Sequence, residues 1–207
     1  MTSATMERDS WNPPVVGGRL VTLRRHKPEN LAAISRWYRD PELSRLTRYS
    51  MRPMPQEEID RFFATRLLSA GSVAYGIHER ATDRLIGLTT FSSLDADNGS
   101  VLFHITIGER DAWGRGFGTE AARLMLWLAF ERMGLHRVGL SVFAFNERAV
   151  RSYRSAGFVE EGRLRGAIAR DGGWWDEIQM GILREEWLAA QAADRQAERQ
   201  PERGRAG

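Results

Sequence analysis

Hydrophobic and polar positions follow two different periods along this chain, and the changes of period predict its elements. Alternation with a period of two is typical of strands, whereas apolar residues three and four apart are typical of helices. The predicted strands are 18–24, 73–79, 85–91, 101–107, 138–143, 158–170 and 174–183. The predicted helices are 28–39, 56–69, 117–133, 146–155 and a charged segment from 185 onward. Residues 42–55 fit neither period, and we predict an irregular segment there.

The order of these elements predicts the fold class. Turn residues at 81–84 and 171–173 predict hairpins, so most neighbouring strands should be antiparallel. The helix over 117–133 joins two strands as a crossover, which predicts one parallel pair. We therefore predict an α+β fold (mixed α/β), a single domain with a central, mostly antiparallel, twisted mixed sheet flanked by helices. The predicted boundaries are 1–17 for a flexible leader, 18–188 for the domain and 189–207 for a charged tail that is helical and then disordered.

A glycine-rich turn lies between a predicted strand and a predicted helix, with Gly114, Gly116 and Gly118 at alternate positions. Backbone N–H groups of such a turn, together with those of the helix N-terminus behind it, can bind a phosphate. A P-loop has Gly-Lys-Ser/Thr at its end, but Thr119 directly follows Gly118. A Rossmann fingerprint has another glycine spacing and an acidic residue after the next strand. The turn therefore predicts a phosphate cradle of another kind, with packing or helix capping as the structural alternative.

Composition narrows the class of protein. The chain of 207 residues is 42% hydrophobic, and it has no apolar run near the ~18 residues of a membrane helix, so we expect no membrane span. Its polar N-terminus lacks a signal core, which predicts a cytoplasmic protein. There is no cysteine, and the four histidines lack metal-ligand spacing, so we expect no thiolate or metal site. Basic and acidic residues alternate around a net charge of +3, which offers no patch for nucleic acid and suits an anionic cofactor.

Three stretches, in this order and spacing, resemble the GNAT superfamily of acetyl-CoA-dependent N-acetyltransferases. Residues 113–121, Trp-Gly-Arg-Gly-Phe-Gly-Thr-Glu-Ala, are similar to the pyrophosphate loop of that family. Residues 146–153, Asn-Glu-Arg-Ala-Val-Arg-Ser-Tyr, are similar to its Asn-x-x-Ala-x-x-x-Tyr helix, and Gly157-Phe158 with residues 173–180 resembles its closing hairpin. The resemblance covers about residues 18–184, and the branch named for ribosomal-protein alanine N-acetyltransferases is the most similar.

The chain departs from the family pattern at two places. Trp113 stands where the loop usually has Gln or Arg, which fits the named branch. Relatives often carry a Glu in the strand before the loop, whereas residues 101–107 contain no acid. The resemblance therefore defines the cofactor loop better than it defines a general base.

The resemblance implies that an acetyl group passes from acetyl-CoA, a co-substrate, to a primary amine by direct attack on the thioester. Tyr153 would act as general acid; it lies seven residues after Asn146 and so on the same helix face. The residues implied to bind acetyl-CoA are Ile105, Ile107, Arg115, Gly116, Phe117, Gly118, Thr119, Asn146 and Ala149. The structural alternative is that Asn146 only caps its helix and Tyr153 is a core aromatic.

The general base and the acceptor are less clearly marked. His104 is the catalytic candidate for the base, beside Glu109, Asp111, Glu177 and a water chain. The candidate acceptor residues are Trp37, Tyr49, Trp174, Trp175 and Asp176. The structural alternative is that the aromatic residues among them, at helical or strand spacing, belong to the core. The acceptor would be a protein N-terminus or a small amine such as a polyamine, an amino acid or an aminoglycoside. The competing functions are a non-catalytic acyl-CoA-binding regulatory module and a structural or partner-binding domain; relatives often form homodimers.

Overall fold

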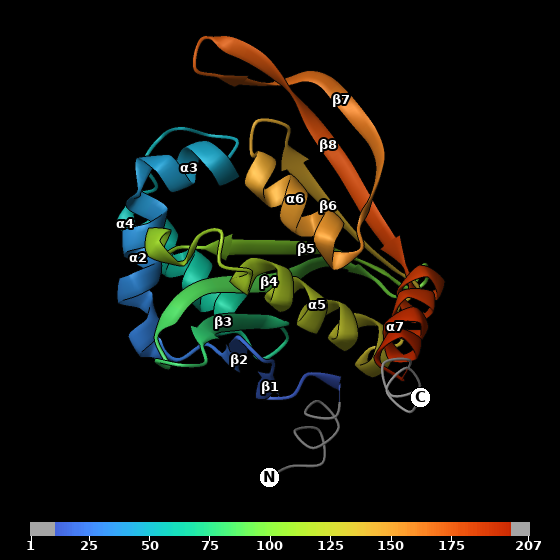
Figure 1. Ribbon diagram of the computed structural model, residues 1–207. Helices are drawn as coiled ribbons and strands as arrows, with labels where there is room; N and C mark the ends of the chain where they lie inside the picture. The colour runs from blue at the N-terminus through green and yellow to red at the C-terminus, as the bar shows by residue number, and fades with distance from the viewer. Residues whose placement is uncertain (1–10, 200–207) are drawn as a thin grey trace.

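The computed structural model describes residues 11–199, which form a mixed sheet of eight strands with helices packed on both faces (Figure 1). The strands run in the order β1-β2-β3-β4-β5-β6-β8-β7. Their bounds are β1 Val15–Gly17, β2 Val21–Arg25, β3 Ala74–Glu79, β4 Leu85–Asp95, β5 Ser100–Ile107, β6 Arg137–Phe143, β7 Val159–Arg170 and β8 Gly173–Leu183. The α-helices are α2 Leu31–Arg39, α3 Pro41–Thr47, α4 Gln56–Phe62, α5 Phe117–Trp127, α6 Glu147–Ala156 and α7 Arg184–Arg199. The shorter helical segments are η1 Pro28–Asn30, η2 Phe63–Leu67, η3 Arg110–Ala112 and η4 Leu128–Arg132.

β5 and β6 are the parallel pair that the crossover through α5 predicts. Their pairing runs from Ser100 with Arg137 to Leu102 with Gly139, and the two strands then diverge. The other neighbouring strands of the described sheet are antiparallel. The divergence leaves the second half of β5 without a strand partner on that side.

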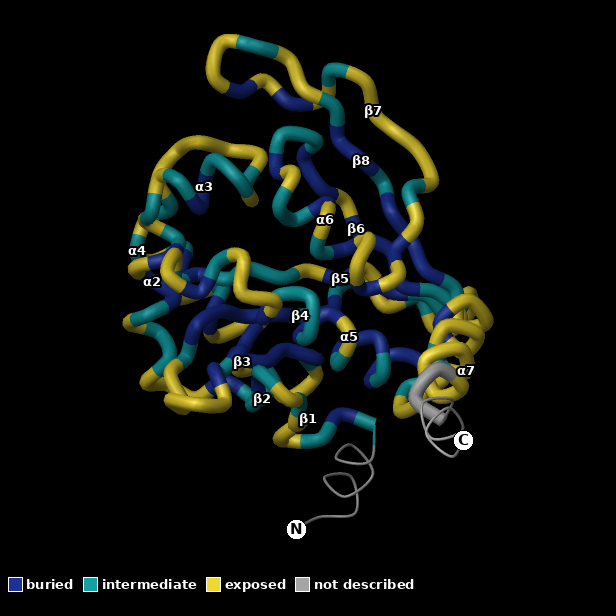
Figure 2. The backbone as a smooth tube through the Cα atoms, viewed as in Figure 1, coloured by how far each residue is buried: buried dark blue, intermediate teal, exposed yellow. Residues whose placement is uncertain are grey.

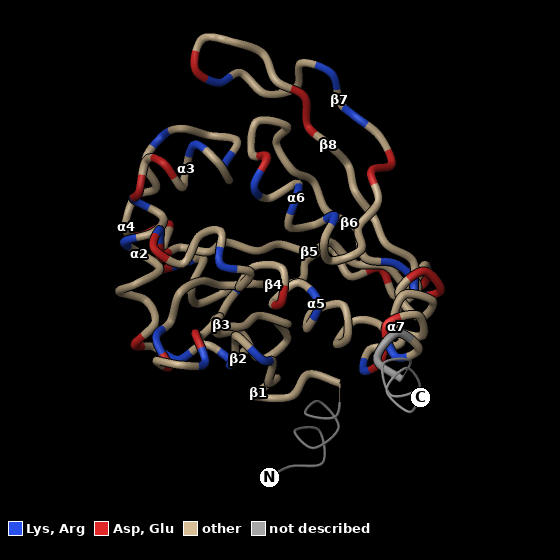
Figure 3. The backbone as a smooth tube through the Cα atoms, in the orientation of Figure 1, with Lys and Arg blue, Asp and Glu red and all other residues tan. Residues whose placement is uncertain are grey.

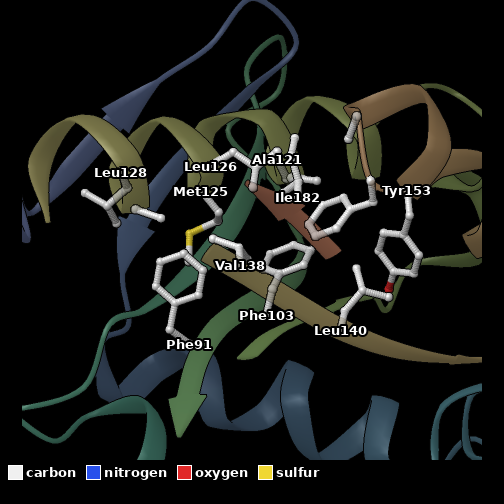
Figure 4. Packing of buried hydrophobic residues seen from close by; sticks show 14 of the residues in the cluster. Phe91, Phe103, Ala121, Met125, Leu126, Leu128, Val138, Leu140, Tyr153 and Ile182 are labelled. Atoms are coloured by element: carbon white, nitrogen blue, oxygen red, sulfur yellow. The ribbon is translucent and has the colours of Figure 1, made fainter. Parts of the chain in front are cut away.

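Alternation along the central strands divides the hydrophobic core into two layers. Phe103 of β5 packs beneath α5 and α6, in the layer that also contains Met125 and Tyr153 (Figure 4). Ala74 and Leu88 point to the opposite face, against α2, α3 and η2. Figure 2 shows the central strands buried between these layers, whereas most of β7 is exposed. The central strands are therefore buried on both faces, and the outer part of the β7–β8 hairpin projects from the edge of the sheet (Figure 1).

The sheet begins earlier than the sequence predicts. Residues 15–17, which we assigned to the leader, form β1 and pair with β2. The turn after β1 is held by Glu120 of α5, whose carboxylate accepts the N–H groups of Arg19, Leu20 and Val21 at 3.0, 2.6 and 2.7 Å. This contact joins segments about a hundred positions apart, so the local pattern of apolar residues carries no signal of it.

The two ends of the chain only partly fall within the described residues. Residues 1–10 of the predicted leader and residues 200–207 of the predicted tail lie outside them. α7 crosses the predicted boundary at 188 without a break and continues to Arg199. The predicted helical part of the tail is therefore the end of the last helix of the domain.

α3 replaces the first part of the segment that we predicted to be irregular. We interpreted Asp40-Pro41 as the end of a helix, and it also begins the next one. Asp40 Oδ1 accepts the N–H groups of Glu42 at 2.8 Å and Leu43 at 3.3 Å. Pro41 lacks an N–H group, but this costs no hydrogen bond at the first helical position, because an N–H there has no acceptor within the helix. The same two residues therefore stop α2 and start α3.

Substitution of Asp40 by alanine should lower the free energy of unfolding by about 1–2 kcal/mol, because α3 loses its N-cap. Arg110, whose Nε lies 3.0 Å from Asp40 Oδ2, loses its carboxylate partner as well. For a chain of this length we expect thermal denaturation to show a fall of roughly 2–8 °C in Tm. Asp40→Asn, which retains a capping oxygen, is the control and should keep most of the stability. An unchanged Tm in Asp40→Ala would contradict the capping role.

Candidate active site

A cavity of about 1060 Å³ opens where β5 and β6 diverge. Its walls come from both strands, from α6, from the glycine turn before α5, and from α2, α3 and the loop after α3. Figure 1 shows how the fold brings these distant segments to one end of the sheet. The predicted site residues that line the cavity are Trp37, Tyr49, His104, Ile105, Ile107, Gly116, Phe117, Gly118, Thr119, Asn146, Ala149 and Tyr153.

The other predicted site residues are not part of the cavity lining; they are Arg115, Trp174, Trp175 and Asp176. The Arg115 guanidinium donates to Glu79 Oε1 at 2.7 Å, although its backbone belongs to the glycine turn. Trp174 is 74% exposed on the β7–β8 hairpin. Trp175 donates to the Arg170 carbonyl at 3.2 Å, and Asp176 accepts the N–H of Gly166 at 3.0 Å. The Trp175 ring also packs against Phe145, outside the hairpin, at 5.6 Å between centroids.

The glycine turn presents open backbone donors to the cavity. Gly114 and Gly116 have φ of 74° and 83°, a left-handed conformation that glycine adopts without strain. α5 begins directly afterwards, at Phe117, and no side chain caps it. Within residues 11–199 no acceptor is bonded to the N–H groups of Phe117, Gly118 or Thr119. An uncapped helix N-terminus of this kind fits the diphosphate of acetyl-CoA.

Strand alternation also directs backbone donors of β5 into the cavity. The N–H of Gly108 bonds to the Ile86 carbonyl of β4 at 2.8 Å, so even-numbered positions of β5 turn their N–H groups toward β4. The N–H groups of Ile105 and Ile107 therefore point to the open side, where β6 has diverged. Trp113 donates its indole N–H to the Ile107 carbonyl at 2.8 Å and fixes the turn against the end of the strand.

Tyr153 contributes its ring to the core and its hydroxyl to the cavity. The ring packs edge-on against Phe103 and Phe158, with centroid separations of 6.3 and 5.9 Å. In Figure 4 the hydroxyl points toward Leu140 of β6, and it makes no hydrogen bond within the described chain. Burial raises the pKa of Tyr153, so the phenol stays protonated at neutral pH. The position of the ring fits the core interpretation, and the catalytic interpretation stays a prediction.

The start of α6 is anchored before it reaches Tyr153. Asn146 Oδ1 accepts the N–H of Ala149 at 3.3 Å, and Asn146 Nδ2 donates to the Leu46 carbonyl at 3.1 Å. Asn146 is therefore a helix cap that also ties α6 to the end of α3. One turn after Ala149, Ser152 Oγ lies 2.9 Å from the Thr119 hydroxyl oxygen of α5. The sequence reasoning missed Ser152, although its spacing of three from Ala149 puts both residues on one helix face.

His104 lines the cavity on β5, and Ser92 Oγ lies 2.6 Å from its Nε2. Desolvation by the surrounding protein lowers the pKa of His104, so the imidazole is neutral at neutral pH and able to accept a proton. Ser92 was not a predicted site residue, because only the β4–β5 pairing brings it to His104.

The other candidate bases differ in where their carboxylates lie. Glu109 accepts the indole N–H of Trp37 at 2.9 Å and also pairs with Arg36. Asp111 pairs with Arg84 at 2.6 Å. Glu177 alone among these carboxylates lines the cavity, and among residues 11–199 it is the one acidic residue in that lining.

Among residues 11–199, no group of three or more acidic or histidine side chains is placed to hold a metal ion. In the same part of the chain, no helix has the length and apolarity that crossing a bilayer requires.

Comparison with known proteins gives consistent results. The family model described as the acetyltransferase (GNAT) domain matches residues 20–159. An uncharacterized N-acetyltransferase of Bacillus licheniformis, p20, is 25% identical over 169 residues, which are 81% of this chain and 94% of that protein. Spermidine N(1)-acetyltransferase of Vibrio cholerae is 33% identical over 110 residues, 53% of this chain and 63% of that protein. A crystal structure of the Vibrio cholerae spermidine N-acetyltransferase with CoA and spermine superposes with a TM-score of 0.72 and 24% identity, over 82% of this chain and 98% of that chain.

The match of the family model covers most of the domain, and it includes the glycine turn, the uncapped start of α5 and Tyr153. The chain therefore belongs to the GNAT family and is an acetyl-CoA-dependent N-acetyltransferase.

Proposed function

We propose that this protein transfers the acetyl group of acetyl-CoA to a primary amine by direct attack on the thioester, with Tyr153 as general acid. The observation that carries the proposal is a single cavity shared by the uncapped start of α5 and the Tyr153 side chain. The backbone from Arg115 to Thr119, with the Thr119 hydroxyl, would hold the diphosphate. The N–H groups of Ile105 and Ile107 face the region that the acetyl group would occupy, where they would polarise its carbonyl.

Each proton transfer in this reaction has a donor or an acceptor among the residues that line the cavity. The amine nitrogen bonds to the thioester carbon, and the C–S bond then breaks with its electron pair going to sulfur. His104, neutral because of its lowered pKa, would take the proton that the amine gives up. Tyr153 would supply a proton to the departing sulfur and regain one as the site resets.

The acceptor is a protein N-terminus or a small amine, and two curated spermidine acetyltransferases among the relatives favour a small amine. Trp37 and Tyr49 line the part of the cavity formed by α2 and the loop after α3, where the acceptor would lie. The alternative function is a non-catalytic acyl-CoA-binding regulatory module. That module would bind acetyl-CoA but acetylate no amine. Release of free CoA in the presence of an amine therefore distinguishes the enzyme from the module.

Calorimetric titration of acetyl-CoA into the wild type and Gly116→Glu tests the proposal. We expect a Kd in the micromolar range for the wild type, about −8 kcal/mol. The variant should bind at least ~100-fold more weakly, because the new carboxylate repels the diphosphate and the residue is strained at a positive φ. Release of free CoA with amines then tests turnover.

Gly172→Glu is the matched control for this titration. Gly172 has a φ of 76°, close to that of Gly116, but it lies in the β7–β8 turn. It receives the same charge and comparable backbone strain, so it should leave the acetyl-CoA affinity unchanged. Equal affinity in wild type and Gly116→Glu would rule out the glycine turn as the diphosphate site.

A further inference from the structure

The acceptor side of the cavity contains a buried carboxylate with a free oxygen. Glu177 of β8 is 5% exposed and lies opposite Phe143, at the end of β6. Its Oε1 accepts the Tyr49 hydroxyl, and no donor of the described chain reaches its Oε2. A buried carboxylate with an unused oxygen facing a cavity is suited to bind one ammonium group.

The remaining charges of the cavity lining are arginines: Arg48, Arg66, Arg148 and Arg151. Two of them are on α6, beside the glycine turn, where an anionic cofactor would lie. Arg148 stacks on the Trp113 ring at 3.7 Å, and Arg151 pairs with Glu147 at 3.1 Å. Arg148 and Arg151 therefore lie on the acetyl-CoA side of the cavity, and Arg48 and Arg66 are the arginines that an acceptor could contact.

Arg48 and Arg66 lie on the acceptor side, and no carboxylate of the described chain pairs with either of them. Arg48 donates to the Arg52 carbonyl at 3.2 Å, and its charge opposes the rise that burial causes in the pKa of Tyr38. The side chain of Arg66, on η2, forms no hydrogen bond or ion pair within residues 11–199. Tyr38 and Phe62, which also line the cavity, pack together at 5.2 Å between centroids. The acceptor region thus combines aromatic rings, two guanidinium groups and one carboxylate.

A polyamine does not match this distribution of charge. It carries several ammonium groups, of which Glu177 can neutralise one, while the others would approach guanidinium groups of the same sign. Figure 3 shows basic segments on α3 and α6, each beside an acidic position in the first turn of its helix, and an acidic segment on β8. An amine with a carboxylate or phosphate nearby would satisfy both signs.

We propose, on the basis of the acetyl transfer proposed above, that the acceptor is a primary amine that carries an anionic group. Glu177 binds its ammonium group, and Arg48 and Arg66 bind its anion. Under this assignment the chain differs in specificity from the spermidine acetyltransferases that it resembles.

Initial rates of CoA release at saturating acetyl-CoA test the assignment with matched pairs of amines. The carboxylate pair is phenylalanine and phenylalaninamide, the phosphate pair is phosphoethanolamine and ethanolamine, and spermidine is the polycation. We expect kcat/KM of the anionic member to exceed that of its neutral partner by ~10-fold or more in at least one pair, from a charge-assisted hydrogen bond. That member should also exceed spermidine, and the pair that shows the effect identifies the anion.

Arg66→Gln should remove most of this preference, because kcat/KM of the anionic member falls toward that of its neutral partner. Arg61→Gln is the matched control, because Arg61 is an exposed arginine of α4 outside the cavity lining. Glu177→Gln should raise KM for every amine by ~10-fold without changing the acetyl-CoA Kd.

A higher kcat/KM for spermidine, or equal rates within both pairs, would overturn this inference and leave the acetyl transfer standing. Acetylation of none of these amines by a protein that binds acetyl-CoA would also overturn this inference, whereas the proposed function would then be tested with a peptide N-terminus as the acceptor.

Discussion

Tyr153→Phe should reduce kcat by about 10²–10⁴-fold, the usual contribution of a positioned general acid. The substitution removes only the hydroxyl, so the edge contacts of the ring with Phe103 and Phe158 remain. Because the hydroxyl makes no hydrogen bond within the described chain, its loss leaves no broken protein contact. We therefore expect an unchanged Tm and an acetyl-CoA Kd within about 3-fold of the wild type. Steady-state kinetics with calorimetry separates these quantities.

Tyr75→Phe is the matched control for this experiment. Tyr75 is also a buried tyrosine, but its hydroxyl donates to Asn12 Oδ1 at 2.5 Å, and it is not part of the cavity lining. Its loss should lower stability by about 1–3 kcal/mol, because a buried acceptor loses its donor, and should leave kcat unchanged. A kcat of Tyr153→Phe within about 3-fold of the wild type would eliminate Tyr153 as the acid.

The raised pKa of Tyr153 also predicts the shape of the pH profile. The folded pKa lies above the ordinary value, so the protonated, active form persists as pH rises past neutrality. The rate should therefore show no alkaline fall from Tyr153 below about pH 10. The lowered pKa of His104 affects the acid side of the profile. The imidazole stays neutral somewhat below its ordinary pKa of 6.5, so the acid fall in rate should begin at a lower pH than for a free histidine.

The parts of the fold that sequence predicts well are those with short-range signals. The strands near 73–79 and 101–107 and the helix near 117–133 each carry one clear period, and the structure has β3, β5 and α5 with η4 there. The parallel pairing of β5 and β6 is confirmed because a helical crossover leaves little choice. β1 escaped detection because its three residues are too few to show a period, and its turn depends on Glu120.

The candidate site divides in the same way. The glycine turn and the α6 positions of Asn146 and Tyr153 are local motifs, and the structure brings them to one cavity. The β7–β8 hairpin is different, because its register shifts twice, between Glu160 and Gly162 and between Leu164 and Ile168. The first shift adds one residue to β7 and so moves later residues of β7 to the other face, whereas the second adds two and keeps the face. Alternation counted along the sequence therefore misassigns the faces of β7 after Glu160.

Gly108→Ala should produce the largest loss of stability among these substitutions. A Cβ at Gly108 would lie 2.0 Å from Cδ2 of Trp37, far inside a normal contact. The indole is 3% exposed, and its N–H is bonded to Glu109 at 2.9 Å, so the ring cannot move aside without losing that bond. Overpacking of this kind costs about 3 kcal/mol, which corresponds to roughly 6–12 °C in Tm for a chain of this size.

Gly71→Ala is the control for this prediction, because nothing lies within 4 Å of a Cβ there and its φ is not positive. Its Tm should stay at or slightly above that of the wild type. The double variant Gly108→Ala with Trp37→Leu should recover part of the loss, since the smaller side chain leaves room for the methyl group. Because Trp37 also lines the cavity, both variants at Gly108 should raise KM for the amine more than the Kd for acetyl-CoA. If Gly108→Ala and Gly71→Ala have the same Tm, Trp37 does not pack on Gly108, and the acceptor wall of the cavity has a different shape.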